Sequence, residues 1–151
     1  MRQQAAVQAG EKLAMASTIN HQSALIYVMV TMSAADSVMR DREFRTIGGI
    51  VESLPVFEEV NRDALVAAAE DCVSLLEPED GLDAVLGLVK EALSPALCET
   101  AYALACEVAA ADGTLEQEEL RLLELIRHEL DVDRLHAAAI ERGVRARYTT
   151  A

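Results

Sequence analysis

Tryptophan is absent from this 151-residue chain, and aromatic residues make up only 3% of it. Its apolar half is therefore mainly alanine, leucine and valine, a composition that favours helix when glutamate is also abundant. No run of 18 uninterrupted apolar residues occurs, so we expect no membrane span. The N-terminal residues lack the basic-then-apolar pattern of a secretory signal, which makes the cytoplasm the expected location.

Basic residues are also scarce, with 13 Lys and Arg against 26 Asp and Glu, for a formal net charge of −13. Such a balance argues against nucleic acid as a partner, because its phosphates would be repelled rather than neutralised. An acidic surface suits cations and basic protein partners, and it also serves plain solubility.

Cysteine is limited to Cys72, Cys98 and Cys106, none of which stands in a CxxC pair. An odd number of thiols cannot all pair within one chain. Each lies in an apolar helical stretch, where a free cysteine usually behaves as a small hydrophobic residue. We therefore expect structural thiols rather than reactive ones.

Catalytic signatures are missing as well. The sequence holds no glycine-rich phosphate loop, nucleophile elbow, HExxH or Ser/Lys motif. His21, His128 and His136 share no metal-ligand spacing, and we expect them to be structural. The chain is therefore predicted not to be an enzyme.

Helical periodicity runs through almost the whole sequence, without a competing strand pattern. It predicts an all-α fold of seven to eight helices in one bundle-like domain over residues 1–151, with residues 1–18 prone to fraying. Asn61 and Ser94 are expected N-caps, and Pro95 should occupy the first position of a helix. The expected helices span about 4–16, 20–35, 40–54, 62–76, 78–93, 95–111, 115–130 and 133–148.

An internal repeat becomes visible when the chain is shifted by 76 residues. The segment Ser-Ala-Ala-Asp at 33–36 then falls on Ala-Ala-Ala-Asp at 109–112, and Glu43 falls on Glu119. The apolar ladder of Phe44, Ile47, Ile50 and Leu54 falls on Leu120, Leu123, Ile126 and Leu130. The shift is half the chain length, which predicts a duplication with copies at roughly 1–75 and 76–151.

The loop of the second copy carries Asp112, Gly113 and, six residues after the glycine, Glu119. A purely structural explanation accounts for each of these residues. Glycine permits the reversal, Thr114 caps the next helix, and acidic residues suit its first turn. The spacing also matches the second half of an EF-hand calcium loop. A complete EF-hand is excluded, because the earlier ligand positions are Val108 and Ala110.

If the two copies pack about a pseudo-twofold axis, four carboxylates could converge, those of Asp36, Glu43, Asp112 and Glu119. Oxygen ligands of this kind suit Ca²⁺, Mg²⁺ or Mn²⁺ rather than zinc. The first copy departs from the second, because Ser37 replaces the glycine and Arg40 and Arg42 stand where the second copy has glutamates. Nearby cations weaken cation binding, so the second loop is the better candidate.

The repeated Ala-Ala-Asp-Gly…Glu signature between two helices resembles that of the tellurite-resistance TerB family, over about residues 20–148. Related domains occur in membrane-bound J-domain co-chaperones. The resemblance implies a stress-response protein whose acidic positions, here Asp112 and Glu119 and then Asp36 and Glu43, bind a divalent metal. It also implies docking to other tellurite-resistance proteins, a membrane-embedded one among them. The chain would then lie peripheral to the inner membrane without inserting, and a homodimer is one arrangement to consider.

Two other functions stay open from the sequence. In the first, the chain is a pure protein–protein interaction module whose acidic residues are helix caps and partner contacts, without metal. In the second, a thiol reacts directly with tellurium oxyanions, which would require an exposed cysteine of low pKa. The negative field of the chain disfavours attracting such an anion.

Overall fold

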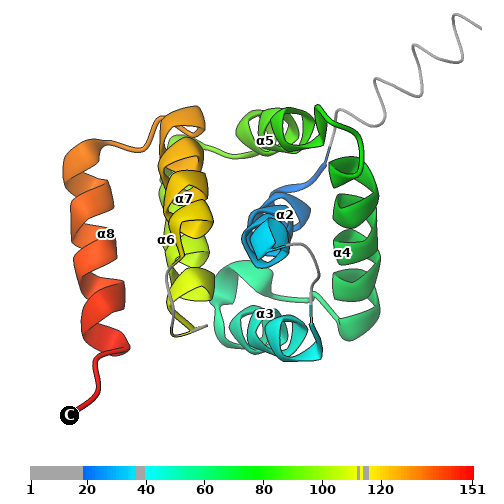
Figure 1. The fold of residues 1–151 in the computed structure, drawn as a ribbon. Helices are drawn as coiled ribbons and strands as arrows, with labels where there is room; N and C mark the ends of the chain where they lie inside the picture. Colours follow the sequence, from blue (N-terminus) through cyan, green and yellow to red (C-terminus); the bar gives the residue numbers. More distant parts are fainter. Residues whose placement is uncertain (1–18, 37–39, 112, 114–115) are drawn as a thin grey trace, which may run out of the picture.

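The computed structural model describes residues 19–36, 40–111, 113 and 116–151, and within them every regular element is helical (Figure 1). The all-α prediction is confirmed. The expected helix at 4–16 lies outside the described residues. The α-helices are α2 (His21–Ser33), α3 (Asp41–Ser53), α4 (Arg62–Leu76), α5 (Gly81–Ala92), α6 (Pro95–Ala111), α7 (Gln117–Glu129) and α8 (Arg134–Arg147), with short 3-10 turns η1 (Ala34–Asp36) and η2 (Pro55–Phe57).

Several helices begin at, or within one residue of, the position predicted from the sequence, and a side-chain cap is present at each of these starts. The Asn61 side chain accepts a hydrogen bond from the backbone N–H of Ala64 at 2.8 Å, and α4 starts at the next residue. Ser94 caps α6 in the same way, with Pro95 at its first position. Asp133 caps α8 by accepting from the backbone of Leu135 at 2.8 Å.

Two predicted helix starts were too early. Helix α5 begins at Gly81 rather than at Pro78, because the Pro78 carbonyl accepts the Gly81 N–H at 2.9 Å and closes a turn first. Helix α7 begins at Gln117, which makes Glu116 its N-cap residue. Thr114, the expected cap, lies outside the described residues, and the Glu116 side chain makes no capping hydrogen bond.

Helix α2 is the centre of the molecule. Figure 1 shows it nearly end-on, with α3, α4, α5 and the α6–α7 pair around it, and every residue from Ala24 to Ser33 is buried. A helix that is apolar on all sides is stable only when other elements cover it completely. Its buried threonine and serine differ, because Thr31 donates to the Tyr27 carbonyl at 2.7 Å whereas the Ser33 hydroxyl has no hydrogen-bond partner within the described structure. The helix therefore organises the core but brings one unsatisfied polar atom into it.

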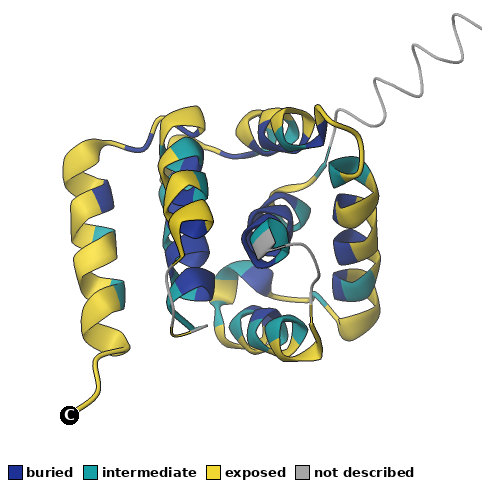
Figure 2. Ribbon diagram, in the orientation of Figure 1, coloured by how far each residue is buried: buried dark blue, intermediate teal, exposed yellow. Residues whose placement is uncertain are grey.

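Helix α8 lies at the edge, packed on α6 and mostly exposed (Figures 1 and 2). Ala137 is its one fully buried residue, with Ile140 and Val144 half-buried against the core. None of the described helices is both long and apolar enough to cross a bilayer.

The helix bounds agree with the 76-residue shift in part. The shift carries α3, Asp41–Ser53, onto α7, Gln117–Glu129, and α4 packs on α2 as α8 packs on α6. Helices α4 and α8 do not match under the shift. It carries Arg62, the first residue of α4, to position 138, whereas α8 begins at Arg134. Duplication itself stays a prediction.

Candidate functional site

The two predicted acidic loops follow the two innermost helices. The first follows α2, whose last turn continues into η1 before α3 begins at Asp41. The second follows α6, which ends at Ala111, and it leads into α7. Because α2 and α6 pack extensively on each other, the elements that carry both loops belong to one core.

The four predicted metal ligands differ in how far the structure describes them. Asp112 lies outside the described residues. Asp36 is the last residue of η1, and only its backbone is described. Glu43 and Glu119 are described fully, and each is the third residue of its helix, α3 or α7.

Glu119 is the buried carboxylate of this region. Its exposed fraction is 4%, and it is the one acidic residue among the buried side chains of the described structure. It takes part in a polar or electrostatic interaction, as burial requires, since an isolated charge in an apolar interior is very costly. Its neighbours Glu116 and Glu118 are exposed. The fold therefore singles out Glu119 from a run of acidic residues.

Glu43 is in a different environment. It is half-buried, and its Oε2 accepts a hydrogen bond from the backbone N–H of Arg40 at 2.9 Å. One of its carboxylate oxygens thus satisfies a free N–H at the start of α3, as a capping residue does. This contact supports the structural explanation for the first loop.

Packing brings the first loop next to the helix that bears Glu119. The η1 turn packs against α7, and α3 packs against α6. Ser33, which immediately precedes η1, is buried with its hydroxyl unpaired within the described structure. The described side chains contain no group of three or more His, Cys, Asp or Glu placed to hold a metal ion. Convergence of the four carboxylates stays a prediction.

All three cysteines are free and buried, as predicted. Burial raises the pKa of the Cys72 and Cys106 thiols to about 11, so that at neutral pH they are protonated. Cys72 also contacts the Tyr27 carbonyl and the Thr31 hydroxyl. The thiol reaction on tellurium oxyanions needs an exposed, low-pKa cysteine, and these thiols are the opposite.

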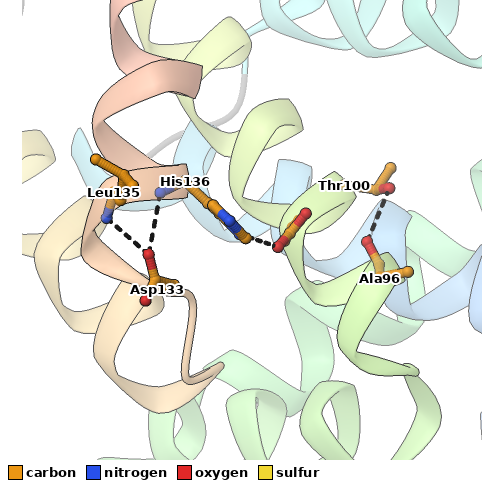
Figure 3. Close-up of polar contacts among 6 residues, drawn as sticks. Ala96, Thr100, Asp133, Leu135 and His136 are labelled. Atoms are coloured by element: carbon orange, nitrogen blue, oxygen red, sulfur yellow. Dashed lines mark hydrogen bonds and ion pairs between the residues drawn. The ribbon is translucent and has the colours of Figure 1, made fainter.

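Polar contacts between α6 and α8 were not anticipated from the sequence. His136 of α8 bonds through Nδ1 to Glu99 at 2.6 Å (Figure 3), and Glu141 accepts from the Tyr102 hydroxyl. Burial, and then this bond, raise the pKa of Tyr102, so the phenol remains a donor. Both pairs lie 37 to 39 residues apart in sequence, and no local pattern could have joined them.

Comparison with protein families gives one result that covers most of the chain. A model of the family described as "Tellurite resistance protein TerB" matches residues 22–142. Searches of curated proteins and of solved structures gave no match.

Proposed function

This chain belongs to the TerB family, and we propose that it serves tellurite resistance as a non-enzymatic protein that binds a divalent cation and docks partner proteins. The cation would be Ca²⁺, Mg²⁺ or Mn²⁺, held by oxygen ligands of the two acidic loops. Glu119 and Asp112 would form the principal part of the site. Asp36 and Glu43 would contribute from the first loop.

The burial of Glu119 is the observation that carries this proposal. An ionised carboxylate removed from water is stable when it is paired, hydrogen-bonded or bound to a cation. The repeat offers a comparison, because Glu43 occupies the equivalent position and is half-buried on a helix start. Capping alone therefore does not require the burial seen at Glu119.

The surroundings of Glu119 also favour a site between the two loops. The η1 turn, which ends at Asp36, packs on α7. The buried hydroxyl of Ser33 beside this turn would gain a partner from a hydrated cation or from its water shell. A ligand at this junction would fasten the end of α2 to the start of α7.

Thermal unfolding of chelator-stripped protein, with Ca²⁺, Mg²⁺, Mn²⁺ or Zn²⁺ added separately, tests the proposal. A cation bound only by the native state at a hundred times its Kd should add about 2.7 kcal/mol to the free energy of unfolding. For Glu119→Gln the cation should no longer raise the midpoint above that of the same variant without metal. Glu118→Gln is the matched control, because Glu118 is the exposed neighbour on the same turn and should keep the full response.

Absence of a midpoint shift with every cation at millimolar concentration would remove metal binding from the account. A shift that persists in Glu119→Gln would place the cation elsewhere.

The second candidate is a protein–protein interaction module without metal, and the capping contact of Glu43 favours it for the first loop. Here the acidic residues would cap helices and contact basic partner surfaces, with other tellurite-resistance proteins, including a membrane-embedded one, as the partners. Binding of the purified partner in detergent would survive chelator and weaken with salt, because exposed charge pairs are screened. Binding that is abolished by chelator would favour the metal-dependent function instead.

A further inference from the structure

A groove of about 620 Å³ runs between α7 and α8, with α6 as its floor. This volume falls within the range of about 300 to 1,000 Å³ that is usual for sites of small molecules. Apolar side chains line it from all three helices, with Ala109 on α6, Leu123 on α7 and Val144 on α8. None of the four predicted metal ligands lines the groove among the residues described. Gly113 lines it, so the groove borders the second acidic loop but contains none of the predicted ligands that the structure describes.

The direction of the three helices gives the groove two different ends. Tyr102 contacts Glu141, and Glu107 pairs with Arg147 at 2.8 Å, so α6 and α8 run parallel. Helix α7 returns from the loop that follows α6, which places Leu120, on its first turns, at the loop end. Leu120 is 49% exposed there, and Tyr148 and Thr149, which follow α8, also line the groove.

Charged side chains gather toward the other end and the middle of the groove. Arg127 stands on the α7 wall and Arg145 on the α8 wall, and neither forms an ion pair within the described structure. Two glutamates also line the groove. Both are exposed, and Glu141 also accepts a hydrogen bond from the Tyr102 hydroxyl.

The wider charge pattern favours an anion. Helix α8 carries four arginines and one glutamate, in a chain whose net charge is −13. Of these charges only Arg145 and Glu141 line the groove, and Glu141 accepts a hydrogen bond from the Tyr102 hydroxyl. Arg145 on the α8 wall and Arg127 on the α7 wall are therefore the two cationic groups that could bind an anion within the groove. A guanidinium group is weakly hydrated and binds carboxylates through paired hydrogen bonds.

We propose that this groove binds a single-chain amphipathic carboxylate of the fatty-acid class. The acyl chain lies over Ala109, Leu123 and Val144 toward the loop end, and the carboxylate is bound between Arg127 and Arg145. Glu124 opposes the ligand's charge and limits its affinity. The arrangement thus predicts effects of opposite sign for the arginines and for this glutamate.

Calorimetric titration of the full chain with decanoate, below its micellar concentration, tests the proposal. Decan-1-ol and decyltrimethylammonium are the matched probes, because they keep the alkyl chain and remove or reverse the charge. Decanoate should bind with the highest affinity of the three. Higher salt should weaken its binding, since the carboxylate is attracted by partly exposed charges.

The variant R127Q/R145Q should bind decanoate about tenfold more weakly or worse, because two charge-assisted hydrogen bonds are lost. R134Q/R142Q is the matched control. It removes two positive charges from α8 at exposed positions that do not line the groove, and it should stay within about twofold of the parent. Glu124→Gln should bind decanoate about two- to fivefold more tightly. Leu120→Glu, at an exposed position, should weaken it.

Several results would overturn the assignment. They are equal affinity for the three alkyl probes, no binding of decanoate, or weakening by R134Q/R142Q as large as that by R127Q/R145Q. Cosedimentation with anionic phosphatidylglycerol vesicles, in the absence of binding to monomeric decanoate, would also overturn it in favour of a surface contact with lipid headgroups.

Discussion

Adding one methyl group at two glycines of the same helix should change stability in opposite directions. Gly81 begins α5, and a Cβ built there would lie 2.6 Å from the backbone oxygens of Leu75 and Leu76. These are main-chain atoms, which cannot move aside as a flexible side chain does. Overpacking of this kind costs about 1 to 3 kcal/mol. At Gly87, an exposed interior position of α5, a Cβ would meet nothing within 4 Å.

Gly87→Ala should therefore stabilise the protein by about 0.5 to 1 kcal/mol, the cost of glycine in a helix interior relative to alanine. Urea unfolding followed by far-ultraviolet circular dichroism would measure both free energies, and it suits a chain without tryptophan. In thermal unfolding each kcal/mol should shift the midpoint by about 2 to 4 °C. If Gly81→Ala were as stable as the parent, the close approach of α5 to the end of α4 would be wrong. If both variants gained stability, helix propensity alone would explain the result.

Three further predictions follow from caps and titrating groups. Asn61→Ala should destabilise the protein by about 1 kcal/mol in urea unfolding, because α4 loses its N-cap, whereas Asn61→Asp should not. The hydrogen bond with Glu99 raises the pKa of His136, so its stabilising effect is complete below pH 6.5 and is lost as the pH rises through the folded-state pKa. In Glu99→Gln this part of the pH dependence of unfolding should disappear. Cys72 and Cys106 should resist thiol labelling of the native protein at neutral pH and react fully in denaturant, and rapid native labelling of either would contradict their burial.

Local signals in the sequence predicted most of the helix bounds. Asn61 and Ser94-Pro95 marked the starts of α4 and α6 to the residue, because capping depends on side chains within a few positions. The start of α5 was misplaced, since Pro78 satisfies the rules for a first helical residue and equally those for a tight turn. The Gly81 N–H, bonded to the Pro78 carbonyl at 2.9 Å, and the close approach of Gly81 to the end of α4 distinguish the two, and the residue type at position 78 specifies neither.

The sequence predicted less about the candidate sites than about the helix bounds. Periodicity placed Glu43 and Glu119 at equivalent positions, but it could not tell that one is half-buried and the other buried. The groove could not be predicted at all, because its walls belong to α7 and α8 and its floor to α6. Arg145 and Arg147, in the last turn of α8, suit the helix dipole, and that interaction requires no neighbouring helix. Arg127 becomes a candidate ligand-binding residue only because α8 forms the other wall of the groove.

The difference between the two glutamates bears directly on where function resides. Two equivalent loops would be expected to bury both carboxylates, yet Glu43 accepts an N–H bond at a helix start and is half-buried, whereas Glu119, in the first turn of α7, is buried. Loss of a cap costs about 1 kcal/mol and leaves the rest of the structure intact. Neutralising a buried carboxylate removes the charge around which its surroundings are arranged. Glu43→Gln should therefore act mainly on stability. Under the proposed function, Glu119→Gln should instead change what the protein binds, and that result would locate the binding in the second loop.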